Sequence, residues 1–254
     1  MLVVGSTGGV GQLVVAKLLE SGFRVKALAR SEESARALFA DAFASDDDAF
    51  EVVTGVDLRD AAALERSGAC VGVDAIVSCV GTTAFPSARW RDGNGPEATD
   101  FVSGAFYTLS PNARRIVLVS SIGVTRTDRM PFLVLNLFGV LKFKAMGEQA
   151  VVDSGIPYTI LRPGRLTDGP YTSYDVNTVL RATSGTRRAV DLRLGDDLLP
   201  EETSRIVVAD AAVAALSSAA CVGKGYCLGT REGEGPGSDF GKWDALFEGA
   251  GGVS

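Results

Sequence analysis

A phosphate-binding loop is indicated near the start of the chain by Gly5, Gly8 and Gly11, which have the spacing G-x-x-G-x-x-G. In such a loop the first glycine permits a tight turn and the second lets the backbone approach a diphosphate. The third brings the following helix against the sheet, so that phosphates meet the helix N-terminus. A glycine-rich turn without a ligand is the alternative. The apolar strand before the loop and the amphipathic helix after it favour the nucleotide-binding interpretation.

Arg30 directly follows the second expected strand, residues 23–29, and its side chain indicates the type of nucleotide that would bind. In nucleotide-binding βαβ units this position lies beside the adenosine ribose, and a carboxylate there binds the ribose of NAD. A guanidinium would instead form a bidentate contact with a 2′-phosphate. We therefore expect NADP(H), with an exposed charge at a strand end as the alternative for Arg30.

Several other kinds of chemistry are disfavoured by composition. The chain has no histidine, and its four cysteines lack C-x-x-C spacing, so neither a metal site nor a disulfide framework is expected. The absent histidine also removes Ser-His and Cys-His nucleophiles. A net charge of −6 gives no general attraction to nucleic acid. Lysine, tyrosine, serine, carboxylates or a bound cofactor must supply any chemistry.

Strands and helices alternate along the chain, and the expected strands are uniformly apolar. This pattern predicts an α/β fold with a doubly wound parallel sheet, the Rossmann fold. With neither an internal repeat nor a linker, residues 1–254 are expected to form a single NAD(P)-binding domain. The expected strands are 2–4, 23–29, 50–54, 75–79, 115–120 and 158–161, and the expected helices are 10–21, 32–39, 61–66, 98–109 and 133–153.

Several motifs together resemble the atypical short-chain dehydrogenase/reductases, and within them the NmrA-like NAD(P)-binding group that includes chloroplast proteins of plants and algae. The motifs are GSTGGVGQLVVAKLLESGFRVKALAR from Gly5, VDLRD from Val56, VSSIGV from Val119, MGEQAVVDSGIPYTILRPGRLTDGP from Met146 and SRIVVADAAVAAL from Ser204. The resemblance extends from Met1 to about Leu228. It implies a plastid stroma location, with the cytoplasm as the alternative, although no targeting segment is visible.

The resemblance also assigns cofactor contacts. Asp57 and Leu58 would hold the adenine, and residues 79–83 would pass behind the ribose and the nicotinamide. From the residues alone, Asp57 could equally cap the helix expected at residue 61. The expected cofactor-binding residues are Gly5, Thr7, Gly8, Gly9, Val10, Gly11, Arg30, Asp57, Leu58, Cys79, Val80, Gly81, Thr82 and Lys144.

The expected catalytic residues are Ser121 and Lys144. The resemblance makes Ser121 the hydroxyl partner of a substrate and Lys144 the lysine of the family's Tyr-x-x-x-Lys pair, in which a phenol exchanges a proton with the substrate. Val140 occupies the tyrosine position, so the phenol is missing. Alternatively, Lys142 and Lys144 are surface charges, with Lys144 paired to Glu148 one turn later. Tyr171 and Tyr174 are the phenols that could replace the missing one.

The C-terminal part is expected to complete the substrate site. Residues of about 162–205 and 230–254 would contribute a small substrate lobe and a C-terminal segment, with a mainly structural role for Arg162. A short helix at 240–247 should dock through Phe240, Trp243 and Phe247. The apolar run at residues 130–141 is interrupted and far shorter than the roughly 20 residues of a membrane span.

Two functions remain open from the sequence. The first is an NADPH-dependent reductase of a small carbonyl or enone substrate, because the cofactor supplies the hydride and the protein supplies orientation. The second is a non-catalytic NADP(H)-binding redox sensor or plastid assembly factor. The missing phenol favours the second, and Lys144 with the Arg-Pro-Gly segment from Arg162 favours the first.

Overall fold

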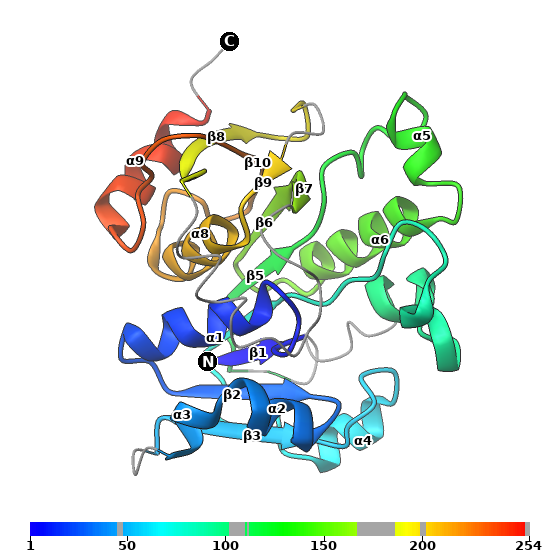
Figure 1. Ribbon diagram of the computed structural model, residues 1–254, viewed down its shortest axis with the longest axis vertical. Coiled ribbons are helices and arrows are strands. Elements are labelled where there is room, and N and C mark those ends of the chain that lie inside the picture. The colour runs from blue at the N-terminus through cyan, green and yellow to red at the C-terminus, as the bar shows by residue number, and fades with distance from the viewer. Residues whose placement is uncertain (45–47, 102–109, 111, 167–185, 199–201, 252–254) are drawn as a thin grey trace.

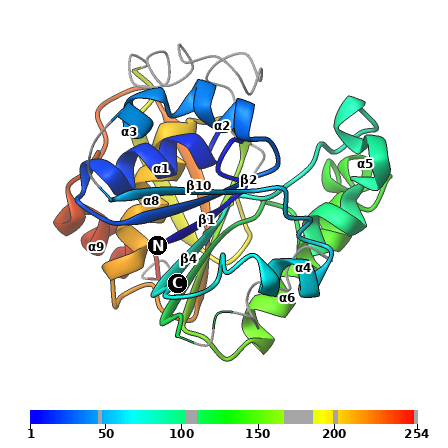
Figure 2. The same ribbon diagram turned by 90° about the horizontal axis from the view of Figure 1, so that it is seen from below.

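The computed structural model describes residues 1–44, 48–101, 110, 112–166, 186–198 and 202–251. An eight-stranded sheet runs through its centre, parallel except at its last pair, and helices lie on both faces (Figures 1 and 2). The doubly wound α/β fold is therefore confirmed. The strand order is β3 (Phe50–Thr54), β2 (Val25–Ala29), β1 (Leu2–Val4), β4 (Ala75–Ser78), β5 (Arg115–Val119), β6 (Tyr158–Pro163), β10 (Lys224–Arg231) and β8 (Ala189–Leu194).

Alternate residues of each central strand point to opposite faces of the sheet, so β1 contributes to two cores. Val3 packs in the core that includes α1 (Gly11–Glu20), α8 (Arg205–Ser217) and α9 (Phe240–Gly249). Leu2 and Val4 pack in the opposite core, with α4 (Ala61–Arg66) and α6 (Val140–Asp153). Because both faces are covered, the strands must be apolar throughout, as the sequence indicated.

Side-chain caps fix where several helices begin. The side chains of Ser31, Asp60 and Asp239 accept backbone N–H groups three residues later, and these caps start α2 (Glu32–Leu38), α4 and α9. Each cap satisfies one of the N–H groups that a helix start leaves unpaired. Three other short helices of the described residues are α3 (Ala40–Ala44), η1 (Ala88–Gly93) and η2 (Glu97–Phe101).

The helix expected at 133–153 is wrong, because the structure divides this segment. A short helix α5 (Phe132–Leu135) is followed by a turn, and α6 begins after Gly139. Gly139 has a φ of 78°, a left-handed conformation that a helix interior does not contain. For the helix expected at 98–109, the structure describes only η2, and residues 102–109 lie outside the described part of the chain. The other expected elements are confirmed to within two residues.

The C-terminal third contains elements that were not expected from the sequence. Strand β10 pairs parallel with β6 and antiparallel with β8, while α8 is almost wholly buried. A separate two-stranded sheet joins β7 (Arg165–Leu166) to β9 (Glu202–Thr203). Because residues 167–185 and 199–201 lie outside the described residues, the substrate lobe stays a prediction.

Helix α9 docks on the body of the molecule, as expected. Trp243 and Phe247 are each 1% exposed and belong to the core that contains α1 and α8. Phe240, which was expected to share that contact, is 40% exposed and lies at the start of the helix. Two of the three aromatic side chains therefore hold the helix in place.

Candidate functional site

Two cavities lie along one edge of the sheet, at the carboxyl ends of its central strands. The first, the Arg30 cavity, has a volume of about 430 Å³ and extends over β2, β1 and β4. The second, the Lys144 cavity, has a volume of about 230 Å³ and extends over β4, β5 and β6. They share the wall formed by Cys79, Val80, Gly81 and Thr82. Ligands of open α/β sheets bind at this edge, where strand order reverses beside β1.

The glycine loop between β1 and α1 is tightly packed. A Cβ atom on Gly11 would lie 2.1 Å from the carbonyl oxygen of Gly5, so α1 approaches the loop only because residue 11 has no side chain. Gly5 itself has a φ of 74°, and its Cβ would meet the backbone of Cys79 at 3.0 Å. At Gly8 the corresponding contact, with Gly5, is 3.2 Å. The packing thus requires the first and third glycines more strictly than the second.

The expected cofactor residues divide between the two cavities. Gly9 and Val10 line the Lys144 cavity, whereas Gly11 supports the loop beneath. The expected residues that line the Arg30 cavity are Gly5, Thr7, Gly8, Arg30, Asp57 and Leu58, together with the four shared residues.

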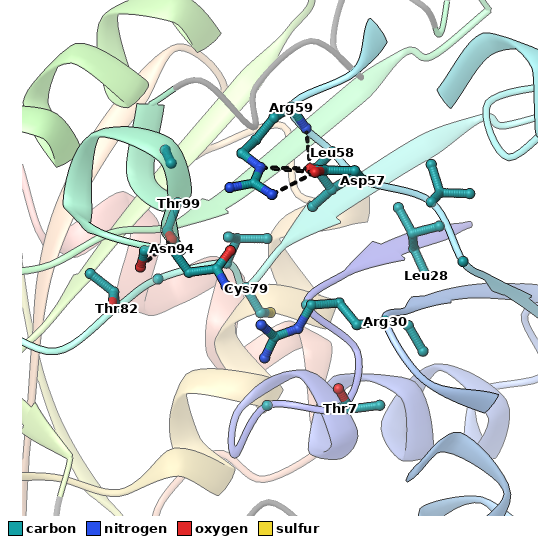
Figure 3. A pocket seen from close by; sticks show the side chains of 18 residues that line it. Thr7, Leu28, Arg30, Asp57, Leu58, Arg59, Cys79, Thr82, Asn94 and Thr99 are labelled. Atoms are coloured by element: carbon teal, nitrogen blue, oxygen red, sulfur yellow. Dashed lines mark hydrogen bonds and ion pairs between the residues drawn. The ribbon is translucent and has the colours of Figure 1, made fainter. Parts of the chain in front are cut away.

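In the Arg30 cavity, a guanidinium extends from the end of β2 into the space between Thr7 and Cys79 (Figure 3). Within the described part of the chain, Arg30 makes no ion pair. A second guanidinium, that of Arg59, is held by Asp57 through contacts of 2.6 to 3.0 Å. Arg30 is therefore the cation free to meet an anionic ligand here.

Asp57 does not cap α4, so that alternative is wrong. The cap is Asp60, whose Oδ1 accepts the N–H of Ala63 at 3.0 Å. Asp57 instead accepts hydrogen bonds from the side chain of Arg59 and from its backbone N–H. These bonds, in that order of importance, hold the pKa of Asp57 below its ordinary value. Asp57 therefore remains an anionic acceptor at the rim of the Arg30 cavity.

In the Lys144 cavity, Lys144 is fixed by a buried carboxylate. Its Nζ lies 2.7 Å from Oδ1 of Asp100, and the two side chains are 13% and 1% exposed. The same Nζ would lie 2.9 Å from a Cβ on Gly81. The ammonium can therefore approach the shared wall this closely only because Gly81 has no side chain. Asp100 comes from η2, which approaches α6 closely because Gly147 has no side chain.

Two sequence-based interpretations of this helix are wrong. Lys144 is not a surface charge, and it does not pair with Glu148. The carboxylate of Glu148 accepts hydrogen bonds from Arg162 at 2.7 and 3.0 Å. Arg162 also donates to the carbonyl of Gly195, which agrees with the structural role expected for it. Lys142 is exposed, as the surface alternative supposed.

Hydroxyl groups also line the Lys144 cavity. Ser121 is half-buried, and its Oγ donates to the carbonyl of Ile122 at 3.1 Å. Ser120 is buried, and its Oγ has no hydrogen-bond partner among the described residues. The Oγ1 of Thr82 is also buried without a hydrogen-bond partner among the described residues. Buried hydroxyls without partners are rare in proteins, and here they indicate a place for ligand oxygen or nitrogen atoms.

No phenol lines either cavity among the described residues. Val140 is 3% exposed and packs with Ile122, Val124 and Phe132, so the residue at the tyrosine position points into a core. Tyr171 and Tyr174 lie outside the described residues. Burial raises the pKa of the Cys79 thiol to about 12, so this wall residue stays protonated at neutral pH.

Sequence reasoning missed two charged residues of the site. Asp100 lay within an expected helix, and nothing in its spacing indicated that it would meet Lys144. Arg205 stood inside a motif used for the resemblance, yet it is 3% exposed and lines the Lys144 cavity beside Gly9. Both contacts join distant parts of the chain, which local periodicity cannot detect.

Metal and membrane features were also searched for. No group of metal-ligating side chains occurs within the described ranges. In the same part of the chain, no helix is both long enough and apolar enough to cross a bilayer.

Comparisons with known proteins agree with this geometry. The chain is 34% identical to the chloroplast protein TIC 62 of Oryza sativa subsp. japonica over 65% of its own length and 34% of that protein. It is 31% identical to an uncharacterised chloroplast protein of Arabidopsis thaliana, covering 84% of the chain and 62% of that protein. Sanguinarine reductase of Eschscholzia californica is 28% identical to the chain, and the match covers 97% of this chain and 94% of that enzyme. The chain therefore spans less than two thirds of the first two relatives.

Solved structures show the same fold. The oxidoreductase YlbE of Lactococcus lactis superposes with a TM-score of 0.68 at 17% identity, covering 100% of this chain and 99% of that one. The model of the NAD(P)H-binding family matches residues 5–219. The chloroplast relatives agree with the resemblance drawn from the sequence, and the family match shows that the chain belongs to the NAD(P)H-binding family.

Proposed function

We propose that this protein is an NADPH-dependent reductase of a small carbonyl or enone substrate. The observation that carries the proposal is the shared wall of the two cavities, residues 79–82. This wall joins a cavity with a guanidinium that has no ion-pair partner among the described residues to a cavity with a fixed ammonium and several hydroxyls. One extended dinucleotide can occupy both, with its nicotinamide in the second.

The residues of the Arg30 cavity fit the adenosine half of NADPH. Arg30 would bind the 2′-phosphate through a charge-assisted, bidentate contact. Leu58 offers an apolar surface to the adenine, and Asp57 an acceptor beside it. The glycine loop, with the N-terminus of α1 behind it, would hold the diphosphate.

The residues of the Lys144 cavity fit the reacting half. When bound, the nicotinamide supplies the hydride. Lys144 would hold the nicotinamide ribose by donating hydrogen bonds from an ammonium that Asp100 keeps in place. Ser121 would turn its hydroxyl from the carbonyl of Ile122 to the substrate oxygen and orient it. Such positioning contributes to catalysis even without an acid at the tyrosine position.

The relatives support a reductase. Sanguinarine reductase matches along nearly its whole length, and the divinyl chlorophyllide a 8-vinyl-reductase of Cucumis sativus is 33% identical over 64% of this chain. The relatives named as chloroplast proteins support a plastid location for this chain as well. Residues of about 162–205 would contribute the wall that encloses the substrate.

A second candidate, a non-catalytic NADP(H)-binding protein, is favoured by one observation. The residue at the tyrosine position is Val140, which is buried in a core away from the cavity. A redox sensor or plastid assembly factor would need the nucleotide site without a proton donor. TIC 62, which matches along 34% of its length, is a relative whose name states no reductase activity.

NADPH oxidation against a panel of quinones, enones and aldehydes tests the proposal. We expect turnover with at least one class, and a loss of roughly 10-fold or more in kcat/KM for Lys144→Met. Lys142→Met is the matched control, because Lys142 lies on the same helix but is exposed. Tight NADPH binding without turnover on any member would favour the non-catalytic protein.

A further inference from the structure

Arg205 lies against the glycine loop, although it comes from a distant part of the sequence. It is the first residue of α8 and is 3% exposed. Its Nε lies 2.9 Å from the position that a Cβ on Gly9 would occupy. The absence of a side chain on Gly9 therefore lets a buried guanidinium reach the backbone of the loop itself.

The place of Arg205 along the groove indicates which part of a ligand it would meet. Gly8 lines the Arg30 cavity, whereas Gly9, Val10 and Arg205 line the Lys144 cavity. A dinucleotide that extends from Arg30 to Lys144 must cross the loop between Gly8 and Gly9. Its adenosine-side phosphate would lie on the Gly8 side, and its nicotinamide-side phosphate on the Gly9 side.

Local helix electrostatics do not explain an arginine at this position. Helix N-termini carry a partial positive charge, so a cation in the first turn of α8 is disfavoured by its own helix. Two helix N-termini, of α1 and α8, flank Arg205 and the loop. The partial positive charge of both N-termini favours an anion beside the loop. Burial strengthens that attraction, because the local dielectric constant is low.

The neighbourhood of Arg205 also has room and polar groups for a ligand. The Oγ of Ser120, a residue 8% exposed, lines the same cavity and has no partner among the described residues. The Nη2 of Arg205 is oriented by a long contact of 3.4 Å with the carbonyl of Leu166. A fixed guanidinium loses little entropy on binding a phosphate, and it matches phosphate oxygens in pairs.

We propose that Arg205 binds the nicotinamide-side phosphate of NADPH. This role rests on the nucleotide site of the proposed function, but it does not require that the protein catalyse a reaction. It adds a ligand for the diphosphate from outside the glycine loop, carried by α8. The nicotinamide half would therefore depend on the C-terminal part of the fold.

Three nucleotides test this assignment by binding alone. NADPH and adenosine 2′-phosphate 5′-diphosphate both contain the second phosphate, and 2′,5′-ADP lacks it. We expect Arg205→Met to raise the dissociation constants of the first two nucleotides by roughly 10- to 100-fold. Binding of 2′,5′-ADP should change by less than about threefold. Isothermal titration calorimetry on the full chain provides the three dissociation constants.

A second variant keeps the test decisive if Arg205→Met does not fold. Gly9→Ala places a methyl group against the Nε of Arg205 and should displace the guanidinium, with the same selective loss. Arg115→Met is the control, because Arg115 is also buried but bonds the carbonyls of Ala215 and Ser218 far from the groove. It should lower thermal stability without changing the ratio of the three affinities.

Other outcomes would overturn the assignment. An equal loss for all three nucleotides would mean that Arg205 only supports the fold. Unchanged affinities combined with a raised KM for a substrate would assign Arg205 to the substrate instead. If the unmutated protein bound none of the three, the nucleotide site would itself fail, and that result is distinct from a fault at Arg205.

Discussion

The ammonium of Lys144, which lines the cavity at the carboxyl ends of β4 to β6, lies 2.7 Å from the carboxylate of Asp100. The pair is almost completely buried, with exposed fractions of 13% and 1% for the two side chains. Removal of one partner would leave an uncompensated buried charge, which is far more costly than losing an exposed pair. Lys144 therefore owes its position to a residue that the family motif does not include.

We predict that the two residues are strongly coupled. Lys144→Met should destabilise the protein by about 3 kcal/mol, because it leaves Asp100 charged and buried. Asp100→Asn in the Lys144→Met background should restore part of this loss, giving a coupling energy of about 1 to 3 kcal/mol in urea unfolding. Asp153→Asn is the control, because Asp153 is an exposed carboxylate at the end of α6, the helix that contains Lys144. Additive effects of the two substitutions would contradict the coupling.

Nucleotide choice should depend on Arg30. NADPH is expected to bind at least about tenfold more tightly than NADH, and Arg30→Ala should remove most of this difference by deleting charge-assisted hydrogen bonds worth about 1 to 3 kcal/mol. Arg24→Ala, an exposed arginine before the same strand, should leave the ratio unchanged. Fluorescence titration with both nucleotides measures the ratio of the two affinities. Equal affinities in the unmutated protein would exclude the 2′-phosphate contact.

The glycines of the loop should separate binding from folding. Gly8→Val is expected to abolish nucleotide binding while the circular dichroism spectrum stays native, since a branched side chain would occupy the diphosphate position. Gly11→Ala should instead lower the melting temperature, because its methyl group would lie 2.1 Å from the carbonyl oxygen of Gly5. Native-like nucleotide affinity in a folded Gly8→Val variant would mean that the loop is only a turn.

Restoring a tyrosine at position 140 should fail. Residue 140 stands one turn before Lys144, at the tyrosine position of the family motif, but Val140 is 3% exposed and packs with Phe132 and Leu141. Val140→Tyr should therefore cost about 1 to 3 kcal/mol through overpacking and add no carbonyl-reducing activity. Thermal unfolding and NADPH oxidation are measured on the same sample. A stable variant with a gain in activity would show that residue 140 can reach the cavity.

The sequence predicted the N-terminal half of the fold well, because its signals are local. Runs such as Arg115–Val119 are apolar and short, and Asp60 starts a helix by itself. The break at Gly139 was missed because the apolar residues on both sides continue a helical pattern. Strand β10 was missed because its glycines and charged ends resemble a loop.

The candidate site was predictable where it follows a motif and unpredictable where it depends on packing. The glycine loop, Arg30 and residues 79–82 follow strands, so their meeting at one edge follows from a parallel sheet. Asp100 and Arg205 reach the Lys144 cavity or its lysine only through helix packing at Gly147 and Gly9. No periodicity in a single sequence specifies those contacts.

Transfer of deuterium from NADPH labelled at the nicotinamide C4 tests the central claim most directly. The protein is mixed with the labelled nucleotide and, in turn, with an enone and an aldehyde, which keep a transferred hydride on carbon, and the products are examined by mass spectrometry. The account predicts that a reduced product carries a single deuterium on carbon, and that Lys144→Met lowers its yield while Lys142→Met does not. NADPH that binds tightly yet gives no labelled product with any acceptor would contradict it.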